Sequence, residues 1–250
     1  MSLTVRQKIV RRLTRMLMPF RYETEDVTTC WCGGSLGPSR SPLVGECVEC
    51  GTGVLRRRLT EAAYERWYAT GDYRRCQMGT VGVSVAQGIK EIRRAEAAFR
   101  LLSDHGLDIY GKSVLDVGCG AGGALIVAKL LRAGMLLGVD SDPRSQEVPR
   151  ALGIQVINSI PVANDWDRIV CSHLIEHIIR PVEFLRMLAL YLSDNGCLYI
   201  ETPAWTEKAE VKLPHVWYLR PESLRLMAKQ AGLKVAAMDD GIRAVLRRAE

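Results

Sequence analysis

The sequence predicts an α/β fold in which helices cover both faces of a mainly parallel sheet. Short apolar, β-branched runs alternate with helical patterns from residue 113 onward, and such alternation is typical of parallel sheets. A glycine-rich turn over 118–123 joins the first run to the first helical pattern. Asp140 follows Gly120 by twenty residues, the spacing at which an acidic side chain meets a ribose bound at such a turn. These observations indicate a Rossmann-like sheet with a nucleoside-binding edge.

The individual elements follow from the periodicity of the apolar residues. We expect strands near 113–117, 135–139, 154–157, 168–172 and 196–201, and two last strands near 233–238 and 242–247. Helices are expected near 122–132, 144–151, 181–192 and 221–231. Asp239-Asp240-Gly241 is a suitable hairpin turn between the last two strands. Together the strands would form a seven-stranded sheet.

The glycine-rich turn also indicates which cofactor it binds. Gly118, Gly120 and Gly123 fit the pattern G-x-G-x-x-G, which leaves a dinucleotide open as the ligand. Asp116 argues against a dinucleotide, because its carboxylate would face an anionic pyrophosphate at short range. S-Adenosylmethionine carries an ammonium group and a sulfonium and has no phosphate. The turn therefore favours S-adenosylmethionine.

Four segments, in order along the chain, resemble the motifs of class I S-adenosylmethionine-dependent methyltransferases. Val114 to Gly123 resembles their first motif, and Gly138 to Asp140 resembles the end of their second strand. Arg168 to His177 and Gly196 to Pro203 resemble their fourth and fifth strands with the loops that follow. The resemblance covers residues 112–247 and implies that the last strand is antiparallel to the others.

The resemblance also implies a cofactor site. It assigns S-adenosylmethionine to the following residues: Asp116, Gly118, Cys119, Gly120, Asp140, Ser141, Ser159 and Ser172. One departure from the family concerns the third strand, after which many members carry an acidic residue near the adenine. Here the segment reads Asn158-Ser159-Ile160-Pro161. Adenine contacts would therefore come from Ser159, from backbone groups or from apolar packing.

Composition places the chain among ordinary globular proteins and leaves room for more than one module. It has 250 residues, 48% of them hydrophobic and 25% charged, which suits one α/β domain with a smaller addition. No run of eighteen apolar residues occurs, so no membrane span is expected. The start of the chain lacks the features of a secretion signal. We therefore expect a cytoplasmic protein, and a net charge of +6 does not by itself indicate nucleic acid as a partner.

We expect four segments: a helix over 1–21, a cysteine-rich module over 28–58, a helical cap over 60–110, and the methyltransferase domain over 112–250. The first is a basic amphipathic helix that ends near Pro19. Three roles are open for it: packing on its own protein, contact with an anionic membrane at its inner face, or contact with RNA.

The module over 28–58 contains two cysteine pairs, Cys30 with Cys32 and Cys47 with Cys50. Four thiolates can form a tetrahedral Zn²⁺ site, and a glycine after each pair lets backbone amides turn toward the sulfurs. So short a module buries too little apolar surface to fold alone, so the metal would supply folding energy. The first pair is one residue shorter than usual, which leaves a ribbon without metal, or free thiols, as alternatives.

The other cysteines indicate the cellular compartment, and the residues after the cysteine-rich module indicate the class of protein. Cys119, Cys171 and Cys197 lie in the turn and in strands, where cysteine behaves as a small apolar residue, so a reducing compartment is expected. The ribbon together with Leu59-Thr60-Glu61 and Gly71-Asp72-Tyr73-Arg74 is similar to the leader of certain bacterial methyltransferases. Those enzymes act on sugars, surface glycans or secondary metabolites, which implies glycan biosynthesis as one setting.

Three of the four histidines are candidates for the chemistry. Methylation of a hydroxyl is helped by a base near neutral pKa, which suits histidine. His173, at the end of the fourth strand, is the first candidate for a base or a positioning residue. His215 is the second, in a segment that family members use as acceptor wall. His177 belongs to the pair Glu176-His177, which resembles a common family pair and has loop anchoring as its alternative role, whereas His105 is expected to be structural.

Polar and aromatic residues near the fifth strand could contribute to the acceptor site. Glu201 would orient a hydroxyl or end the strand in solvent. Trp205, Trp217 and Tyr218 would stack on a sugar or serve packing.

The function that these patterns favour is methyl transfer from S-adenosylmethionine to a hydroxyl of a sugar, glycan or other small metabolite. An RNA methyltransferase is one alternative, although no dedicated RNA-binding motif is present. A non-catalytic scaffold with the same fold is the other. Nucleic acid is not the expected partner, and the oligomeric state is open.

Overall fold

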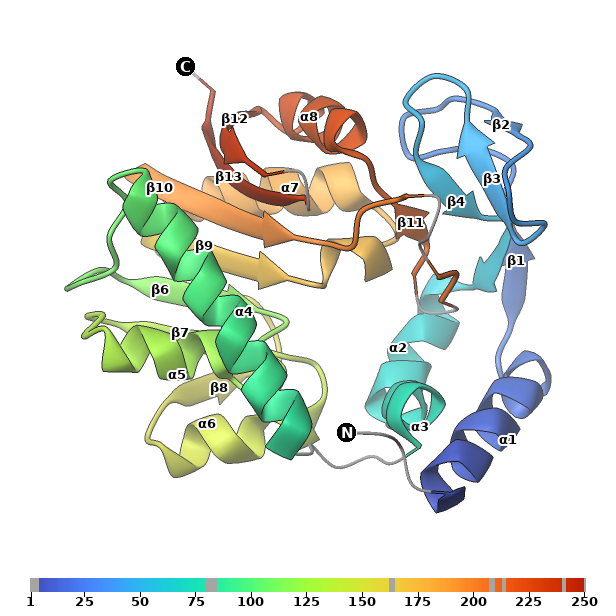
Figure 1. Ribbon diagram of the computed structural model, residues 1–250, viewed down its shortest axis with the longest axis horizontal. Helices are drawn as coiled ribbons and strands as arrows, with labels where there is room; N and C mark the ends of the chain where they lie inside the picture. The colour runs from blue at the N-terminus through green and yellow to red at the C-terminus, as the bar shows by residue number, and fades with distance from the viewer. Residues whose placement is uncertain are drawn as a thin grey trace.

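The computed structural model describes residues 5–79, 85–161, 165–206, 210–212, 215–239 and 242–249. Its centre is a seven-stranded sheet with the order β12-β13-β10-β9-β6-β7-β8 (Figure 1). The strands are β6 (Val114–Val117), β7 (Leu136–Val139), β8 (Gln155–Ile157), β9 (Trp166–Ser172), β10 (Leu192–Glu201), β12 (Leu233–Met238) and β13 (Arg243–Arg248). β13 is antiparallel to both of its neighbours, and the remaining pairs are parallel. The predicted seven-stranded fold with an antiparallel last strand is confirmed.

Helices cover both faces of this sheet. They are α4 (Val85–Asp104), α5 (Gly123–Leu130), η1 (Pro143–Gln146), α6 (Glu147–Ala151), η2 (Ile175–His177), α7 (Pro181–Leu190) and α8 (Pro221–Gln230). On one face, Phe99 of α4 packs with Val114 and Val170 of the strands. On the other, Leu185 of α7 packs with Leu115 of β6. Val114 and Leu115 thus point to opposite faces, as successive strand residues must, and both faces are buried.

Some element boundaries differ from the sequence predictions. The fourth and fifth strands begin earlier than expected, at Trp166 and Leu192. The helix expected over 144–151 is divided into η1 and α6, because Pro149 lacks the N–H that a continuous α-helix would need at that point. Asp240 and Gly241 of the predicted hairpin turn lie outside the described residues.

The cysteine-rich segment forms a small sheet that the core of the protein completes. Its strands are β2 (Leu36–Gly37), β3 (Val44–Cys47) and β4 (Gly53–Leu55), and the order is β11-β4-β3-β2. β11 (Trp217–Tyr218) comes from the segment between β10 and α8 and pairs antiparallel with β4. A second ribbon joins β1 (Thr24–Asp26) to β5 (Arg57–Leu59). The cysteine segment therefore joins the methyltransferase core through β11.

Three N-terminal helices stand opposite the carboxyl ends of the parallel strands (Figure 1). They are α1 (Val5–Arg21), α2 (Glu61–Ala69) and α3 (Asp72–Met78). α1 continues two residues beyond the predicted end at Pro19, because a proline removes only one hydrogen bond in the last turn. Arg21 forms an ion pair with Asp72 of α3 at 2.9 Å. Membrane contact through this helix stays a prediction, and none of the described helices has both the length and the apolarity that crossing a bilayer requires.

Candidate active site

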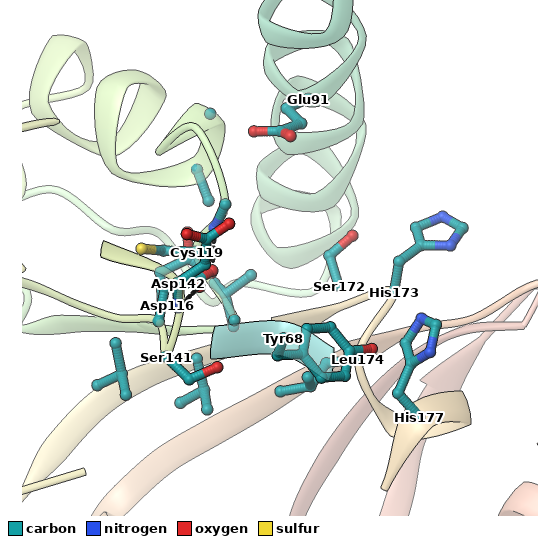
Figure 2. Close-up of a pocket in the computed structure, with 18 of the residues that line it drawn as sticks. Tyr68, Glu91, Asp116, Cys119, Ser141, Asp142, Ser172, His173, Leu174 and His177 are labelled. Atoms are coloured by element: carbon teal, nitrogen blue, oxygen red, sulfur yellow. Dashed lines mark hydrogen bonds between the residues drawn. The ribbon is translucent and has the colours of Figure 1, made fainter. Parts of the chain in front are cut away.

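A pocket of about 1030 Å³ lies at the carboxyl ends of β6, β7 and β9. This edge is where open parallel sheets bind their ligands. Residues of the core strands and loops form its floor, and residues of α2, α3 and α4 close it from the other side. Figure 2 shows carboxylates such as Asp116 on one side of the pocket and the histidines on the other.

The glycine-rich turn and Asp140 meet in this pocket, as their spacing predicts. Gly118 and Gly120 have positive φ values of 75° and 54°, which L-residues other than glycine rarely adopt. The Asp140 carboxylate accepts a hydrogen bond from the Gly120 N–H at 2.9 Å and another from the Asp142 N–H at 2.8 Å. These contacts fix the carboxylate beside the glycine turn, where a ribose would lie.

Three carboxylates, those of Glu91, Asp116 and Asp140, share the glycine side of the pocket. Burial, together with the charges of Glu91 and Asp140, raises the pKa of Asp116 well above its ordinary value. Burial also raises the pKa of Glu91, although its carboxylate accepts hydrogen bonds from Gln87 and from the Ala121 N–H. A cationic ligand would relieve this repulsion, whereas a pyrophosphate would add to it.

Glu91 is a site residue that sequence reasoning missed. It lies on α4, and this helix approaches the turn so closely that a Cβ on Gly123 would stand 2.6 Å from the Glu91 backbone carbon. No local motif marks the position. The only signal is that Gln87, Glu91 and Arg94 recur at helical spacing, which places them on one face of the helix.

The other predicted cofactor residues also line the pocket, but two of their side chains point elsewhere. Gly118, Cys119, Ser141, Ser159 and Ser172 are all part of its wall. The Cys119 side chain is buried in an apolar cluster with Leu125, Ile154 and Val156, so only the backbone of Cys119 can serve a cofactor. The Ser172 hydroxyl donates to Glu201 at 2.7 Å and is engaged within the protein.

The segment after the third strand lines the pocket as well. Asn158 and Ser159 are both part of its wall. The Gln146 side chain donates to the Asn158 Oδ1 at 2.6 Å, which fixes the orientation of this amide. Asn158 is therefore a polar group near the expected adenine, in a segment where an acid is absent.

His173 lies between two carboxylates at the end of β9. Its Nδ1 is 3.3 Å from Glu176 and its Nε2 is 3.7 Å from Glu201. Burial lowers the pKa of His173, but the two carboxylates outweigh burial and raise the pKa above its ordinary value. Its φ of 54° is in the left-handed region, and such strain in a non-glycine residue is common at functional sites.

A buried cluster of Glu176, His177 and His215 lies next to His173. Each residue offers one atom that could bind a metal ion, a carboxylate oxygen or a ring nitrogen, and these atoms lie within 4.8 Å of one another. Burial opposes ionisation of Glu176, but the His173 contact and the nearby imidazoles lower its pKa to about 2. Its 3.3 Å contact with His173 lacks the alignment of a hydrogen bond and becomes an ion pair when the imidazole is protonated. Burial and the neighbouring His177 lower the pKa of His215 to about 3, so His215 is neutral at neutral pH.

Aromatic residues of the cap complete this side of the pocket. Tyr68 and Tyr73 lie edge-on to the His177 ring, at centroid distances of 6.4 Å and 5.9 Å. Both tyrosines line the pocket, and the Tyr68 hydroxyl has no hydrogen-bond partner within the described part of the chain. The sequence offered Tyr73 only as part of the leader motif, without a role.

The aromatic residues for which sugar stacking and packing were both open serve packing. Trp205 and Trp217 are buried and do not line the large pocket. The Trp217 indole donates to the Ile178 carbonyl at 2.6 Å, and Arg40 of the ribbon covers Trp205 at 4.1 Å. Tyr218 is buried too, with its hydroxyl donating to the Lys212 carbonyl at 3.0 Å. The docked ribbon therefore removes these rings from the acceptor site.

The four ribbon cysteines come together as their spacing predicts. Cys32 Sγ lies 3.5 Å from both Cys47 Sγ and Cys50 Sγ, and Cys30 Sγ lies 3.6 Å from Cys50 Sγ. Sulfurs bound to one tetrahedral zinc ion at about 2.3 Å would be separated by about 3.8 Å, so this arrangement suits such an ion. Gly33 has a φ of 88°, which turns the chain after the first pair.

Comparisons with known proteins agree with this geometry. A family model described as a methyltransferase domain matches residues 90–237, which is more than half of the chain. The ubiquinone biosynthesis O-methyltransferase of Chromobacterium violaceum is 26% identical over 160 residues, which is 52% of this chain and 68% of that protein. The chain thus spans about two thirds of that relative's length.

Solved structures show the same fold. The 1,6-didemethyltoxoflavin-N1-methyltransferase of Burkholderia thailandensis, with bound S-adenosylhomocysteine, has a TM-score of 0.59 and 13% identity, and covers 86% of this chain and 100% of its own. Magnesium protoporphyrin IX methyltransferase of Synechocystis, also with S-adenosylhomocysteine, has a TM-score of 0.53 and 15% identity, and covers 74% and 96%. The chain therefore belongs to the methyltransferase-domain family, with the fold of the class I S-adenosylmethionine-dependent enzymes.

Proposed function

We propose that the protein transfers the methyl group of S-adenosylmethionine to a hydroxyl oxygen of a small acceptor. The observation that carries the proposal is the division of one pocket between a carboxylate-rich glycine turn and a group of histidines. The name of the Chromobacterium relative, an O-methyltransferase, supports oxygen as the acceptor atom. A sugar or glycan acceptor has less support, because the aromatic rings that could have stacked on it are buried.

The residues on the glycine side fit the cofactor. Asp116 is a buried carboxylate that accepts no hydrogen bond within the described part of the chain. Its raised pKa falls when an ammonium group approaches, so it suits the amino end of S-adenosylmethionine. Asp140 is held ready for the ribose hydroxyls by the Gly120 N–H.

Methyl transfer releases a proton, which the chain must accept. When bound, the cofactor supplies a methyl carbon activated by its sulfonium: a carbon–oxygen bond forms, a carbon–sulfur bond breaks, and the hydroxyl proton is released. His173 takes this proton at Nε2, the ring nitrogen that faces Glu201 at 3.7 Å. Glu176 stabilises the resulting imidazolium through Nδ1. His215, neutral and in the same wall, is the second candidate for the base.

The proposal is tested with a labelled methyl donor and a panel of small hydroxyl-bearing acceptors. Asp140→Ala removes the group assigned to the ribose, so the affinity for S-adenosylhomocysteine should fall roughly tenfold or more. Asp194→Ala is the control, because Asp194 is exposed on β10 and forms only a surface pair with Arg248. Transfer of label to an acceptor, lost in the first variant and kept in the second, supports the function. Unchanged affinity of the Asp140 variant by calorimetry contradicts the assignment.

We further propose that the four cysteines hold one structural Zn²⁺. The sulfur distances support it, and Thr52 adds a hydroxyl 3.1 Å from Cys50 Sγ that can stabilise a thiolate. Such a metal would lie away from the pocket, because none of the four cysteines lines it.

A further inference from the structure

Three cationic side chains lie on the side of the pocket over β9 and β10, where the carboxylates of Glu176 and Glu201 face His173. Lys90 and Arg94 lie one turn apart on α4, and Lys212 comes from the segment after β10; all three line the pocket. Among the described residues, none of these side chains forms an ion pair. By contrast, the two arginines near the glycine side, Arg74 and Arg144, are both paired with Asp142.

These cations repel one another. The pKa of Lys90 is lowered first by the charge of Arg94, then by burial and by Lys212, and Glu201 offsets this only in part. Cations in a cleft that form no ion pair attract anionic ligands. An anion bound here would relieve the repulsion and would gain charge-assisted hydrogen bonds.

The place of the cations assigns the anion to the acceptor and not to the cofactor. Lys212 follows β10, and Lys90 is influenced by Glu201 at the end of that strand. The glycine turn follows β6, which is separated from β10 by β9. Two strand spacings correspond to about 10 Å. The cations therefore surround the region where a hydroxyl would meet His173.

We propose that the acceptor carries an anionic group, a carboxylate or a phosphate, and that Lys90, Arg94 and Lys212 bind it beside His173. This inference rests on the proposed function and adds the substrate class to it. The anion fixes the acceptor so that its hydroxyl points toward the histidine and the methyl donor, an orientation that contributes directly to the rate.

The test uses the full-length protein saturated with S-adenosylhomocysteine and matched probes that differ in charge. One arm compares 3,4-dihydroxybenzoate with its neutral amide, and the other compares glucose 1-phosphate with methyl glucoside; inorganic pyrophosphate is a probe without a scaffold. The variant is Lys90→Gln combined with Lys212→Gln. Arg93→Gln is the matched control, because Arg93 is exposed on the same helix and does not line the pocket.

The proposal predicts that the charged member of at least one arm, or pyrophosphate, binds more tightly than any neutral probe. The double variant should lose roughly tenfold or more of that affinity, as expected for charged hydrogen bonds, and Arg93→Gln should lose none. Preference for the carboxylate arm or for the phosphate arm identifies the anion. Equal binding of charged and neutral probes, or no binding of any anion at millimolar concentration, overturns the proposal.

Two further results separate this inference from its alternatives. If the double variant weakens S-adenosylhomocysteine but not 5′-methylthioadenosine, which lacks the amino acid part, then the cations hold the cofactor's carboxylate and the inference is wrong. If the wild-type protein binds no S-adenosylhomocysteine at all, the proposed function itself fails. Binding of the cofactor product without any charge preference overturns only the acceptor assignment.

Discussion

His173 combines two unusual properties at one residue: a left-handed backbone and carboxylates facing both ring nitrogens. A left-handed conformation in a residue other than glycine costs on the order of 1 kcal/mol, and the surrounding structure must offset it. Glu201 reinforces the placement, because its carbonyl accepts the His173 N–H at 2.7 Å. These contacts hold the imidazole over the end of β9, where the proposed transfer would release a proton.

The raised pKa of His173 predicts how activity depends on pH. A base acts in its neutral form, so kcat/KM should fall as the pH is lowered through a pKa above 6.5, the ordinary value for histidine. His173→Asn should reduce the rate by roughly 10² or more and abolish that inflection, while asparagine tolerates the left-handed backbone. The measurement is the pH profile of kcat/KM for both proteins.

His215→Gln is the matched comparison for that profile. The pKa of His215 is lowered to about 3, so its titration falls below the range in which the rate would change. If the inflection persists in the His173 variant and disappears in the His215 variant, the roles of the two histidines are reversed and the assignment is wrong.

At the scale of elements, the side chains of Asp142 and Arg144 connect the loop after β7 to α2 and α3. These contacts are called the latch below. Arg74 of α3 donates to Asp142 at 2.7 Å, and both side chains are buried. Arg144 donates to Asp142 and also to the carbonyls of Tyr68 and Ala69 at the end of α2. Because the Asp142 N–H donates to Asp140, this latch also places the carboxylate assigned to the ribose.

Breaking the latch should therefore reduce stability and cofactor affinity together. Arg74→Met leaves Asp142 with a buried charge and one partner fewer, and loss of one member of a buried pair costs about 3–5 kcal/mol. Arg180→Met is the control, because its pair with Glu61 is exposed on both sides and such pairs contribute about 0–1 kcal/mol. Chemical denaturation and titration with S-adenosylhomocysteine measure both effects. Equal free energies of unfolding for the two variants would show that the latch does not stabilise the fold.

The ribbon is joined to the segment that contains His215 by strand pairing, between β4 and β11. Two residues of β11, Trp217 and Tyr218, pair with Val54 and Gly53. His215 lies two residues before β11, so the ribbon helps to place this histidine in the pocket.

Removal of zinc should accordingly affect the acceptor side before the cofactor side. We expect one zinc ion per chain, and Cys32→Ser with Cys50→Ser should abolish it, because so small a sheet cannot fold without its metal. Acceptor methylation should be lost, while binding of S-adenosylhomocysteine is largely retained. Cys197→Ala, in a buried strand away from the ribbon, serves as the control. A metal-free protein with full activity would contradict the structural role of the site.

Sequence patterns predict those elements that are determined by residues close together in the chain. Alternating strands and helices carry their own periodicity, and Gly120 and Asp140 belong to neighbouring strand ends, so their contact could be anticipated. The pairing of β11 with β4 joins residues that are far apart in the chain and leaves no local mark. For the same reason Glu91 and Lys90, which enter the pocket from α4, could not be found. The sequence predicts aromatic residues near the acceptor, but only the docked ribbon shows that Trp205 is covered.

At the scale of the whole molecule, charged side chains are unevenly distributed over one pocket. Glu91, Asp116 and Asp140 gather at the glycine turn over β6 and β7, and over β9 and β10 the histidines and three cations lie with Glu176 and Glu201. The helices α2 and α3 come from the first part of the chain and stand opposite the carboxyl ends of strands from the second (Figure 1), and Tyr68 and Tyr73 extend from them into the pocket. This polarity matches a cationic methyl donor on one side and an anionic hydroxyl compound on the other.

The central claim is that the acidic side of this pocket binds S-adenosylmethionine. Titration calorimetry of the zinc-loaded protein with S-adenosylhomocysteine, repeated in buffers of different ionisation enthalpy, tests it most directly. We predict micromolar binding at one site with release of a proton, because the ammonium group lowers the raised pKa of Asp116. Affinity should then increase as the pH rises toward that raised pKa. No binding by a folded, zinc-loaded sample would contradict the account and leave a methyltransferase fold without its cofactor.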